Sequence, residues 1–181
     1  MRIFRESDAS LDRHAKVRAA ILSLSEASSE ATGIFLSALQ ARANSADHCI
    51  WSVEDSSGQI QGWLSAGVRL TVNSDLAVIS LQLNYVVVSS SSRGNGRVAN
   101  AVIDAAAGDL ALWTAQAMPD IGDGGVPAMP CDIEYSAECI SPSGRRCADR
   151  FARIFAVTLG NETESKAFIV RSLCDYTFDS F

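Results

Sequence analysis

The segment Ser89-Ser90-Ser91-Ser92-Arg93-Gly94-Asn95-Gly96-Arg97-Val98 lies between two long apolar runs of the chain. The run before it, residues 81–88, is rich in leucine and valine, as is typical of a buried strand. The run after it, residues 98–117, has the length and composition of a helix. We therefore predict a strand that ends in a serine- and glycine-rich turn, with a helix beginning directly after the turn.

This turn predicts a binding site for an anion. The first backbone N–H groups of a helix have no partner within the helix, and the helix dipole adds a partial positive charge at the same end. Glycine lets the backbone approach a phosphate closely, and Arg93 or Arg97 can add charge-assisted hydrogen bonds. The alternative is an ordinary strand-to-helix turn. Two glycines and two arginines within residues 93–97 favour a phosphate or pyrophosphate site.

Composition limits the class of protein. The chain has 181 residues, 48% of them hydrophobic and 20% charged, which suits one globular domain over residues 1–181. Its formal net charge is -6, so we expect no nucleic-acid or anionic-membrane partner, because such binding depends on neutralising phosphates. The N-terminus is charged where a signal peptide is apolar, and no segment suits a membrane span. We therefore expect a cytoplasmic protein.

The cysteines and histidines predict no metal site. The chain has five cysteines, which include no Cys-x-x-Cys pair, and its histidines are His14 and His48. Five well-separated cysteines suit a reducing compartment, in which thiols stay free. We expect buried free thiols in place of zinc ligands, and nothing in the spacing indicates a Cys–His nucleophile pair.

Hydrophobic periodicity gives an order of elements along the chain. The predicted strands are residues 3–6, 48–54, 60–72, 76–88, 131–140, 167–173 and 176–178. A helix is the alternative for residues 167–173. The predicted helices are residues 11–24, 34–44, 98–117 and 145–159, and residues 119–130 are predicted to form a loop. Gly62 and Gly67 are candidates for bulges, and Gly160-Asn161 is predicted to end the last helix. This order predicts an α+β fold with a mixed sheet.

The order of elements, with the Arg-Gly-Asn-Gly turn before the third long helix, resembles the GNAT superfamily of acyl-CoA-dependent N-acetyltransferases. The family signature in this turn is Gln or Arg, two residues, Gly, one residue, then Gly or Ala, and it falls on residues 93–98. Val98 stands where Gly or Ala is expected, so its side chain either crowds the pyrophosphate or packs inward. The resemblance implies a GNAT-like three-layer α/β/α fold with a central mixed, mostly antiparallel, splayed sheet.

The resemblance also implies acetyl-CoA as the co-substrate. The amides of residues 94–98 would hold the pyrophosphate, and the backbone of residues 86–88 would pair with the pantetheine arm as an added strand does. The implied cofactor-binding residues are Val86, Val87, Val88, Arg93, Gly94, Asn95, Gly96, Arg97 and Val98.

Catalytic residues are harder to assign. The position of the general-base Glu that some members carry in the fourth strand falls on Gln82, an amide that cannot take a proton. The Asn and Tyr that many members carry after the fifth strand are also missing, so Tyr135 or Tyr176 would have to act as the acid. Apolar and polar residues alternate in the predicted fifth strand, residues 131–140, which places Glu134 and Glu138 on its polar face. Our candidate base is Glu138, with Glu134 as the second choice. Gln82 and Asn84 would position a water; the alternatives are core amides and solvent-facing acids.

These observations predict an acetyl-CoA-dependent N-acetyltransferase that moves an acetyl group to a primary amine of a small molecule or protein by direct attack on the thioester. The net charge of -6 indicates a cationic acceptor, on the side that the first two helices and residues 119–130 would flank in this family. Dimers are common among proteins of this kind, so a homodimer is an expected partner state. The alternative is a degenerate GNAT-like module that binds acyl-CoA or a protein without turnover, which the missing Glu, Asn and Tyr motivate.

Overall fold

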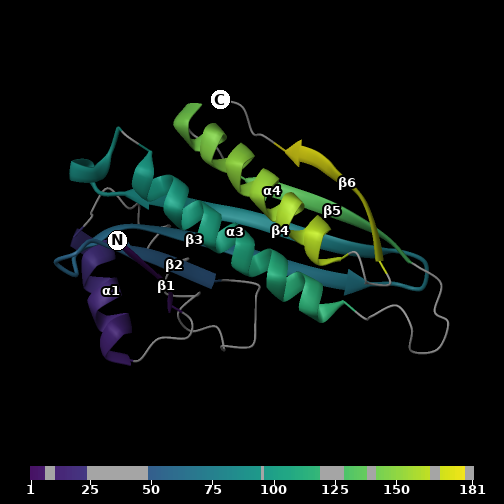
Figure 1. Ribbon diagram of the computed structural model, residues 1–181, viewed down its shortest axis with the longest axis horizontal. Coiled ribbons are helices and arrows are strands. Elements are labelled where there is room, and N and C mark those ends of the chain that lie inside the picture. The colour runs from purple at the N-terminus through teal and green to yellow at the C-terminus, as the bar shows by residue number, and fades with distance from the viewer. Residues whose placement is uncertain are drawn as a thin grey trace. The chain divides into compact units, whose positions relative to one another are not determined.

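A computed structural model describes residues 1–6, 11–23, 49–94, 96–118, 129–137, 142–163 and 168–177. The strands form one sheet in the order β1-β2-β3-β4-β5-β6 (Figure 1). They are β1 (Arg2–Arg5), β2 (Cys49–Glu54), β3 (Ile60–Val72), β4 (Ala77–Val88), β5 (Met129–Ala137) and β6 (Phe168–Thr177). The helices are α1 (Leu11–Ser23), α3 (Arg97–Ala117) and α4 (Pro142–Glu162), with a short 3-10 helix η2 (Ser90–Ser92).

Strand directions confirm the α+β class and the mixed sheet. β1 with β2 and β2 with β3 are antiparallel, whereas β4 with β5 and β5 with β6 are parallel. The predicted helix at residues 34–44 and the predicted loop at residues 119–128 lie outside the described residues. None of the described helices is long and apolar enough to cross a membrane.

The chain divides into two compact units, and β3, β4 and α3 run through both. Unit 1 consists of Met1–Ala66 and Asn84–Ala106, and unit 2 of Gly67–Leu83 and Ala107–Phe181. Unit 1 therefore holds β1, α1, β2 and the turn before α3, while unit 2 holds β5, α4 and β6.

In unit 1, every residue of β2 is buried. The sequence predicts a half-buried strand with Cys49, Trp51 and Val53 facing inward, and this expectation is wrong for the opposite face. Ser52 and Glu54 are buried as well, because charged residues of α1 cover them. A strand with β1 on one side, β3 on the other and both faces covered has no solvent face.

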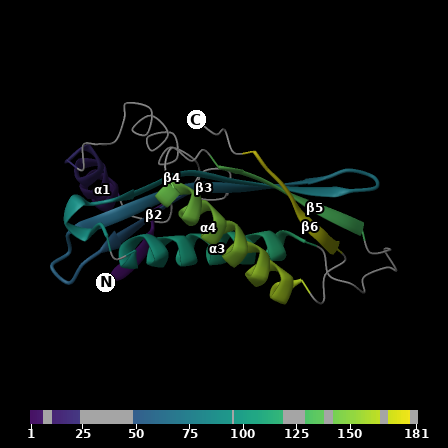
Figure 2. The same ribbon diagram turned by 90° about the horizontal axis from the view of Figure 1, so that it is seen from above.

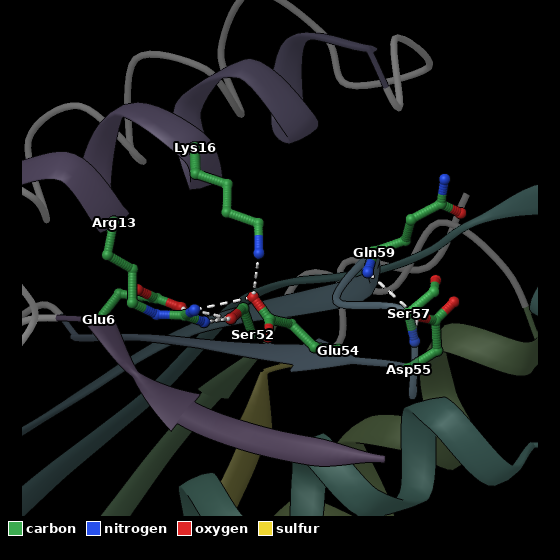
Figure 3. A network of polar contacts seen from close by, with 8 residues as sticks. All are labelled: Glu6, Arg13, Lys16, Ser52, Glu54, Asp55, Ser57 and Gln59. Atoms are coloured by element: carbon green, nitrogen blue, oxygen red, sulfur yellow. Dashed lines mark hydrogen bonds and ion pairs between the residues drawn. The ribbon is translucent and has the colours of Figure 1, made fainter.

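A polar network holds α1 to β1 and β2 (Figure 3). Arg13 of α1 donates one hydrogen bond to Glu54 Oε1 at 2.7 Å and another to Glu6 Oε1 at 2.8 Å. Lys16 Nζ donates to the same Glu54 oxygen at 2.8 Å, and Ser52 Oγ donates to Glu6. The two carboxylates thus face two cations, which satisfies the requirement that buried charges be paired.

In unit 2, α4 packs against β5. The helix buries Ala148, Phe151, Ala152, Phe155 and Leu159, which recur at helical spacing. It begins at Pro142, three residues before the predicted start, because proline is well suited to a first helical turn. It also continues through Gly160-Asn161, contrary to our expectation. Gly160 does not take the left-handed conformation of a helix stop, and Thr163 Oγ1 donates to the Leu159 carbonyl at 2.9 Å instead.

The strands of unit 2 also differ from prediction at their ends. β5 shows the predicted alternation, with Ile133, Tyr135 and Ala137 buried and Glu134 exposed, but it begins at Met129. Residues 138–141 lie outside the described part of the chain. The two predicted terminal segments form one strand, β6, beside β5 (Figure 2).

Substitution of Glu54 by Gln tests the α1 network. Burial opposes ionisation of Glu54, but hydrogen bonds from Lys16 and Arg13 outweigh it and lower the pKa of the carboxyl below its usual 4.5. A lowered pKa stabilises the fold above pH 4.5, and this contribution disappears as pH falls through the folded-state pKa. We expect Glu54→Gln to lower the free energy of unfolding by about 1–2 kcal/mol at neutral pH.

Urea unfolding at neutral pH and at about pH 3 measures this effect, and the difference between wild type and variant should shrink in acid. Asp75→Asn, which removes an exposed acid in the turn between β3 and β4, is the control and should have little effect at either pH. An equal loss for Glu54→Gln at both pH values would contradict the assigned ion pairs.

Candidate functional site

The predicted strand, turn and helix are confirmed at the end of β4. After Val88 the chain forms η2, in which the Ser92 amide donates to the Ser89 carbonyl at 3.0 Å. α3 then begins at Arg97, and the Gly96 carbonyl accepts the Asn100 amide at 2.8 Å. The N–H groups of the first turn of α3 precede this bond, so the helix itself supplies no acceptor for them.

The glycines of the turn are required by backbone conformation. Gly94 has φ +103° and Gly96 has φ +68°, which side chains rarely allow. A Cβ on Gly94 would meet no atom within 4 Å, and one on Gly96 would meet only Asn100. The turn therefore has open space beside its backbone, as an approaching phosphate requires. Asn95 lies outside the described residues.

Val98 packs inward. Its side chain is 7% exposed, and a Cβ built on Gly62 of β3 would lie 2.9 Å from Val98 Cγ1 and 2.8 Å from the Val87 carbonyl oxygen. The two alternatives for Val98 are thereby resolved. The absence of a side chain at Gly62 makes room for valine at a position where the family signature has glycine or alanine.

A bulge in β3 lies beside this contact. Val53 pairs with Gly62 and Glu54 pairs with Ile60, so Gln61 is the extra residue. The predicted bulge at Gly62 is confirmed within one residue; Gly67 lies beyond the stretch that pairs with β2. A bulge redirects side chains, and here the Gln61 side chain contacts two turns that are distant in sequence.

Sequence reasoning missed Gln61 and Asp55. Gln61 Nε2 donates to Asp55 Oδ2 at 2.7 Å, and Gln61 Oε1 accepts from Ser89 Oγ at 2.9 Å and Ser92 Oγ at 2.8 Å. The backbone carbonyl of Gln61 also accepts the Ser89 amide at 2.8 Å. The turn signature Asp55-Ser56-Ser57-Gly58 could have indicated the Asp55 contacts, but nothing local predicts the link to Ser89 and Ser92.

The carboxylate of Asp55 is held in its own turn (Figure 3). Its Oδ1 accepts from the Ser57 hydroxyl at 2.6 Å, the Ser57 amide at 2.8 Å and the Gln59 amide at 3.0 Å. The Ser57 hydroxyl and then the Gln59 amide are the main causes that lower the pKa of Asp55 to about 2. Asp55 is therefore a carboxylate at any physiological pH and can only accept hydrogen bonds.

A cavity of about 390 Å³ lies beside the turn within unit 1. Six of its eight lining residues are polar or charged; the lining consists of Met1, Asp55, Ser56, Gln61, Ser91, Ser92, Arg97 and Val98. Arg97, a predicted cofactor contact, is thus on its wall. The other arginine of the turn, Arg93, is exposed, and its Nε donates to the Val88 carbonyl at 3.1 Å.

The predicted pantetheine strand is the last part of β4. The parallel register with β5 pairs Ala77 with Cys131 at one end and Leu83 with Ala137 at the other, while β4 continues to Val88. Val86, Val87 and Val88 are half-buried. Their role as cofactor contacts stays a prediction.

The predicted catalytic residues do not form one described cluster. Gln82 is exposed and lies opposite Ser136 in the β4–β5 register of unit 2, so its environment is not that of a core amide. Asn84 lies in unit 1, half-buried, and its Nδ2 is a buried donor without a hydrogen-bond partner among the described residues. Glu138 lies outside the described residues, and Glu134 is exposed. Their catalytic roles stay predictions.

Tyr135 is unsuited to the acid role that we considered for it. The side chain is 3% exposed, its hydroxyl donates to the Ala148 carbonyl at 3.1 Å, and its ring stacks on Phe151.

Cys131, on the same strand, is not activated for chemistry. Burial and, after it, the charge of Asp132 raise the pKa of the Cys131 thiol to about 11. Cys131 is therefore a neutral thiol near pH 7 and not an activated nucleophile.

The contact of Gly62 with Val98 can be tested by replacing the glycine. We expect Gly62→Ala to lower the free energy of unfolding by about 1–3 kcal/mol, because neither Val98 nor the Val87 carbonyl leaves room for a methyl group. Val98→Ala in the same chain should recover only part of the loss, since the Val87 carbonyl remains.

Denaturant unfolding of both single variants and the double variant gives the coupling between the two sites. Gly108→Ala in α3 is the matched control, because no atom lies within 4 Å of its added Cβ and the change should stabilise by about 0.5–1 kcal/mol. Strictly additive effects of Gly62→Ala and Val98→Ala would refute the packing described here.

Comparison with known proteins rests on structure. No protein-family model matches the chain, and no curated protein matches it with significance. A ribosomal-protein-alanine N-acetyltransferase from Brucella melitensis biovar Abortus 2308 matches with a TM-score of 0.51 and 16% identity, over 83% of this chain and 90% of that one. The aminoglycoside N-acetyltransferase AAC(6')-Iy, solved in complex with CoA, matches with a TM-score of 0.44 and 16% identity, over 84% of this chain and 85% of that one. The first of these two matches shows that the chain has the GNAT-like fold that its sequence predicts.

Proposed function

We propose that this protein is an acetyl-CoA-dependent N-acetyltransferase that moves an acetyl group to a primary amine of a small molecule or protein. The observation that carries this proposal is the turn between β4 and α3. Gly94 and Gly96 adopt positive φ there, and the first turn of α3 follows directly. With the GNAT fold around it, an anion site at this turn suits the pyrophosphate of acyl-CoA better than an unrelated phosphate.

The residues of the turn fit that group. The Gly94 and Gly96 amides and the N-terminal amides of α3 supply donors, no side chain stands within 4 Å of a Cβ at Gly94, and Val98 is directed away into its contact with Gly62. Arg97 adds a cation on the wall of the adjacent cavity. The backbone of residues 86–88 would pair with the amides of the pantetheine arm, as strand addition does.

Transfer requires a neutral amine and a place for the negative charge. The nitrogen attacks the thioester carbonyl, the new C–N bond forms as the C–S bond breaks, and the CoA thiolate leaves and takes a proton. A backbone N–H of β4 would stabilise the oxyanion, because a fixed donor is needed where charge develops. We assign Asn84 and Gln82 to position a water, and Glu138 to take the proton from the amine.

The chemical class of the acceptor is inferred from the net charge of the protein alone. The net charge of -6 favours a cationic acceptor such as a polyamine-like molecule or a lysine-bearing segment. We propose a homodimer as the state to examine first, because dimers are common among proteins that the sequence resembles.

One observation favours a second candidate function. The phenol of Tyr135 is bonded to the Ala148 carbonyl in the core of unit 2, so it cannot protonate a leaving thiolate there. Tyr176 is then the remaining candidate acid, and a chain in which it does not serve could bind acyl-CoA as a sensor or protein-interaction module without turnover. Binding of the cofactor would be the same in both cases, and only transfer would differ.

Cofactor binding can be tested by thermal unfolding. At a concentration about a hundred times Kd, acetyl-CoA should stabilise the fold by about 2.7 kcal/mol and raise Tm by roughly 5–10 °C. Gly96→Asp should remove this shift, since its carboxylate would stand where the pyrophosphate binds. Gly96→Asn is the matched control: it has nearly the same shape and tolerates positive φ but carries no charge. The absence of a shift for wild type at millimolar acetyl-CoA would refute the proposal.

Turnover separates the two candidate functions. Thiol release from acetyl-CoA, followed over a panel of di- and polyamines and lysine peptides, should exceed the rate without an amine if the protein is a transferase. The rate should rise with pH over the range in which the acceptor loses its proton. Binding without amine-dependent thiol release from any acceptor would favour the sensor or interaction module.

A further inference from the structure

Gln61 connects two turns of unit 1 that lie far apart in sequence. Its side chain bridges Asp55, in the turn between β2 and β3, to Ser89 and Ser92 in the segment that leads into α3. Its backbone carbonyl binds the Ser89 amide as well. Gln61 can reach both turns because it is the extra residue of the β3 bulge.

The direction of these hydrogen bonds is determined by Asp55. A carboxylate only accepts hydrogen bonds, so the Gln61 NH₂ group must face Asp55 and the Gln61 oxygen must face the serines. The hydroxyl groups of Ser89 and Ser92 then each donate a hydrogen bond to Gln61 Oε1. Because Ser89 has no second proton, Ser91 must donate in the 3.2 Å contact between their hydroxyls.

This chain of hydrogen bonds holds the serine segment in one arrangement directly before Arg93 and Gly94. Ser89 is buried, and Asp55, Gln61, Ser91 and Ser92 line the same cavity as Arg97. An anion site made of backbone amides depends on the conformation of its loop, since a loop that is already ordered loses less entropy when the ligand binds.

We propose that Gln61, oriented by Asp55, is a positioning residue for acyl-CoA: it holds Ser89 and Ser92 so that the following turn is ordered before the pyrophosphate binds. This inference rests on the proposed function. It assigns a role in cofactor affinity to a residue of β3 that lies outside the signature segment of residues 93–98.

Gln61→Glu tests the bridge by calorimetric titration with acetyl-CoA at about pH 8 and about pH 5.5. Near pH 8 the introduced carboxylate faces Asp55 and has no proton to donate, so affinity should fall roughly tenfold. Near pH 5.5 the introduced group should be largely protonated, because the adjacent carboxylate raises its pKa, and affinity should return toward the wild-type value at the same pH. The residues that line this cavity bring three charged groups to it: the Asp55 carboxylate, the Arg97 guanidinium and the N-terminal amino group of Met1.

Gln59→Glu is the matched control. Gln59 lies on the same hairpin, is exposed, and uses its backbone amide in the contact with Asp55. The same change of charge there should leave affinity within about twofold of wild type at both pH values. If Gln61→Glu fails to fold, Ser92→Ala and Ser92→Thr decide instead: alanine should weaken binding, and threonine, which keeps the hydroxyl, should restore it.

The outcomes distinguish the inference from the proposed function. Weaker binding by Gln61→Glu that recovers in acid supports the positioning role. If wild type binds acetyl-CoA and Gln61→Glu binds equally well, or binds weakly at both pH values, the positioning role is wrong and the proposed function stands. If wild type itself binds no acetyl-CoA, both are wrong.

Discussion

The candidate site depends on the second half of β4, beyond Leu83, which is the last β4 residue in the described register with β5. β4 continues to Val88 and enters the turn that begins α3. Backbone amides of a strand require partners, and a ligand built from amides can supply them. In the proposed function, the second half of β4 would offer its backbone groups to the pantetheine arm, beside a turn suited to the pyrophosphate.

Two contacts from β3 fix that turn. Gly62 leaves space into which Val98 packs, so the first turn of α3 lies directly against the sheet. Gln61, displaced by the bulge, ties Ser89 and Ser92 to the ionised Asp55. Gly62 acts because it has no side chain, and Gln61 acts through its polar side chain. The turn thus depends on a strand that contributes nothing to the family signature.

Local patterns predicted most of the described elements. The serines and glycines of residues 89–96 indicated the turn, and the alternation in β5 separated Glu134 from Ile133 and Tyr135. Tertiary contacts overrode the local signals elsewhere: α4 passes through Gly160, and α1 covers the polar face of β2. The bridge from Gln61 to Ser92 spans 31 residues, and no local pattern indicates such a contact. The catalytic assignments remain predictions because Glu138 is outside the described residues and Gln82 and Asn84 show only separate environments.

A crystal structure grown with acetyl-CoA tests the central claim most directly. The account predicts pyrophosphate oxygens within hydrogen-bond distance of the Gly94, Gly96 and Val98 amides, with the pantetheine arm extended along residues 86–88. It also predicts that the Ser89 and Ser92 contacts with Gln61 are unchanged by the ligand, since the turn is already ordered. A cofactor bound elsewhere, or a phosphate held in the turn with no groove leading along Val86 to Val88, would contradict it.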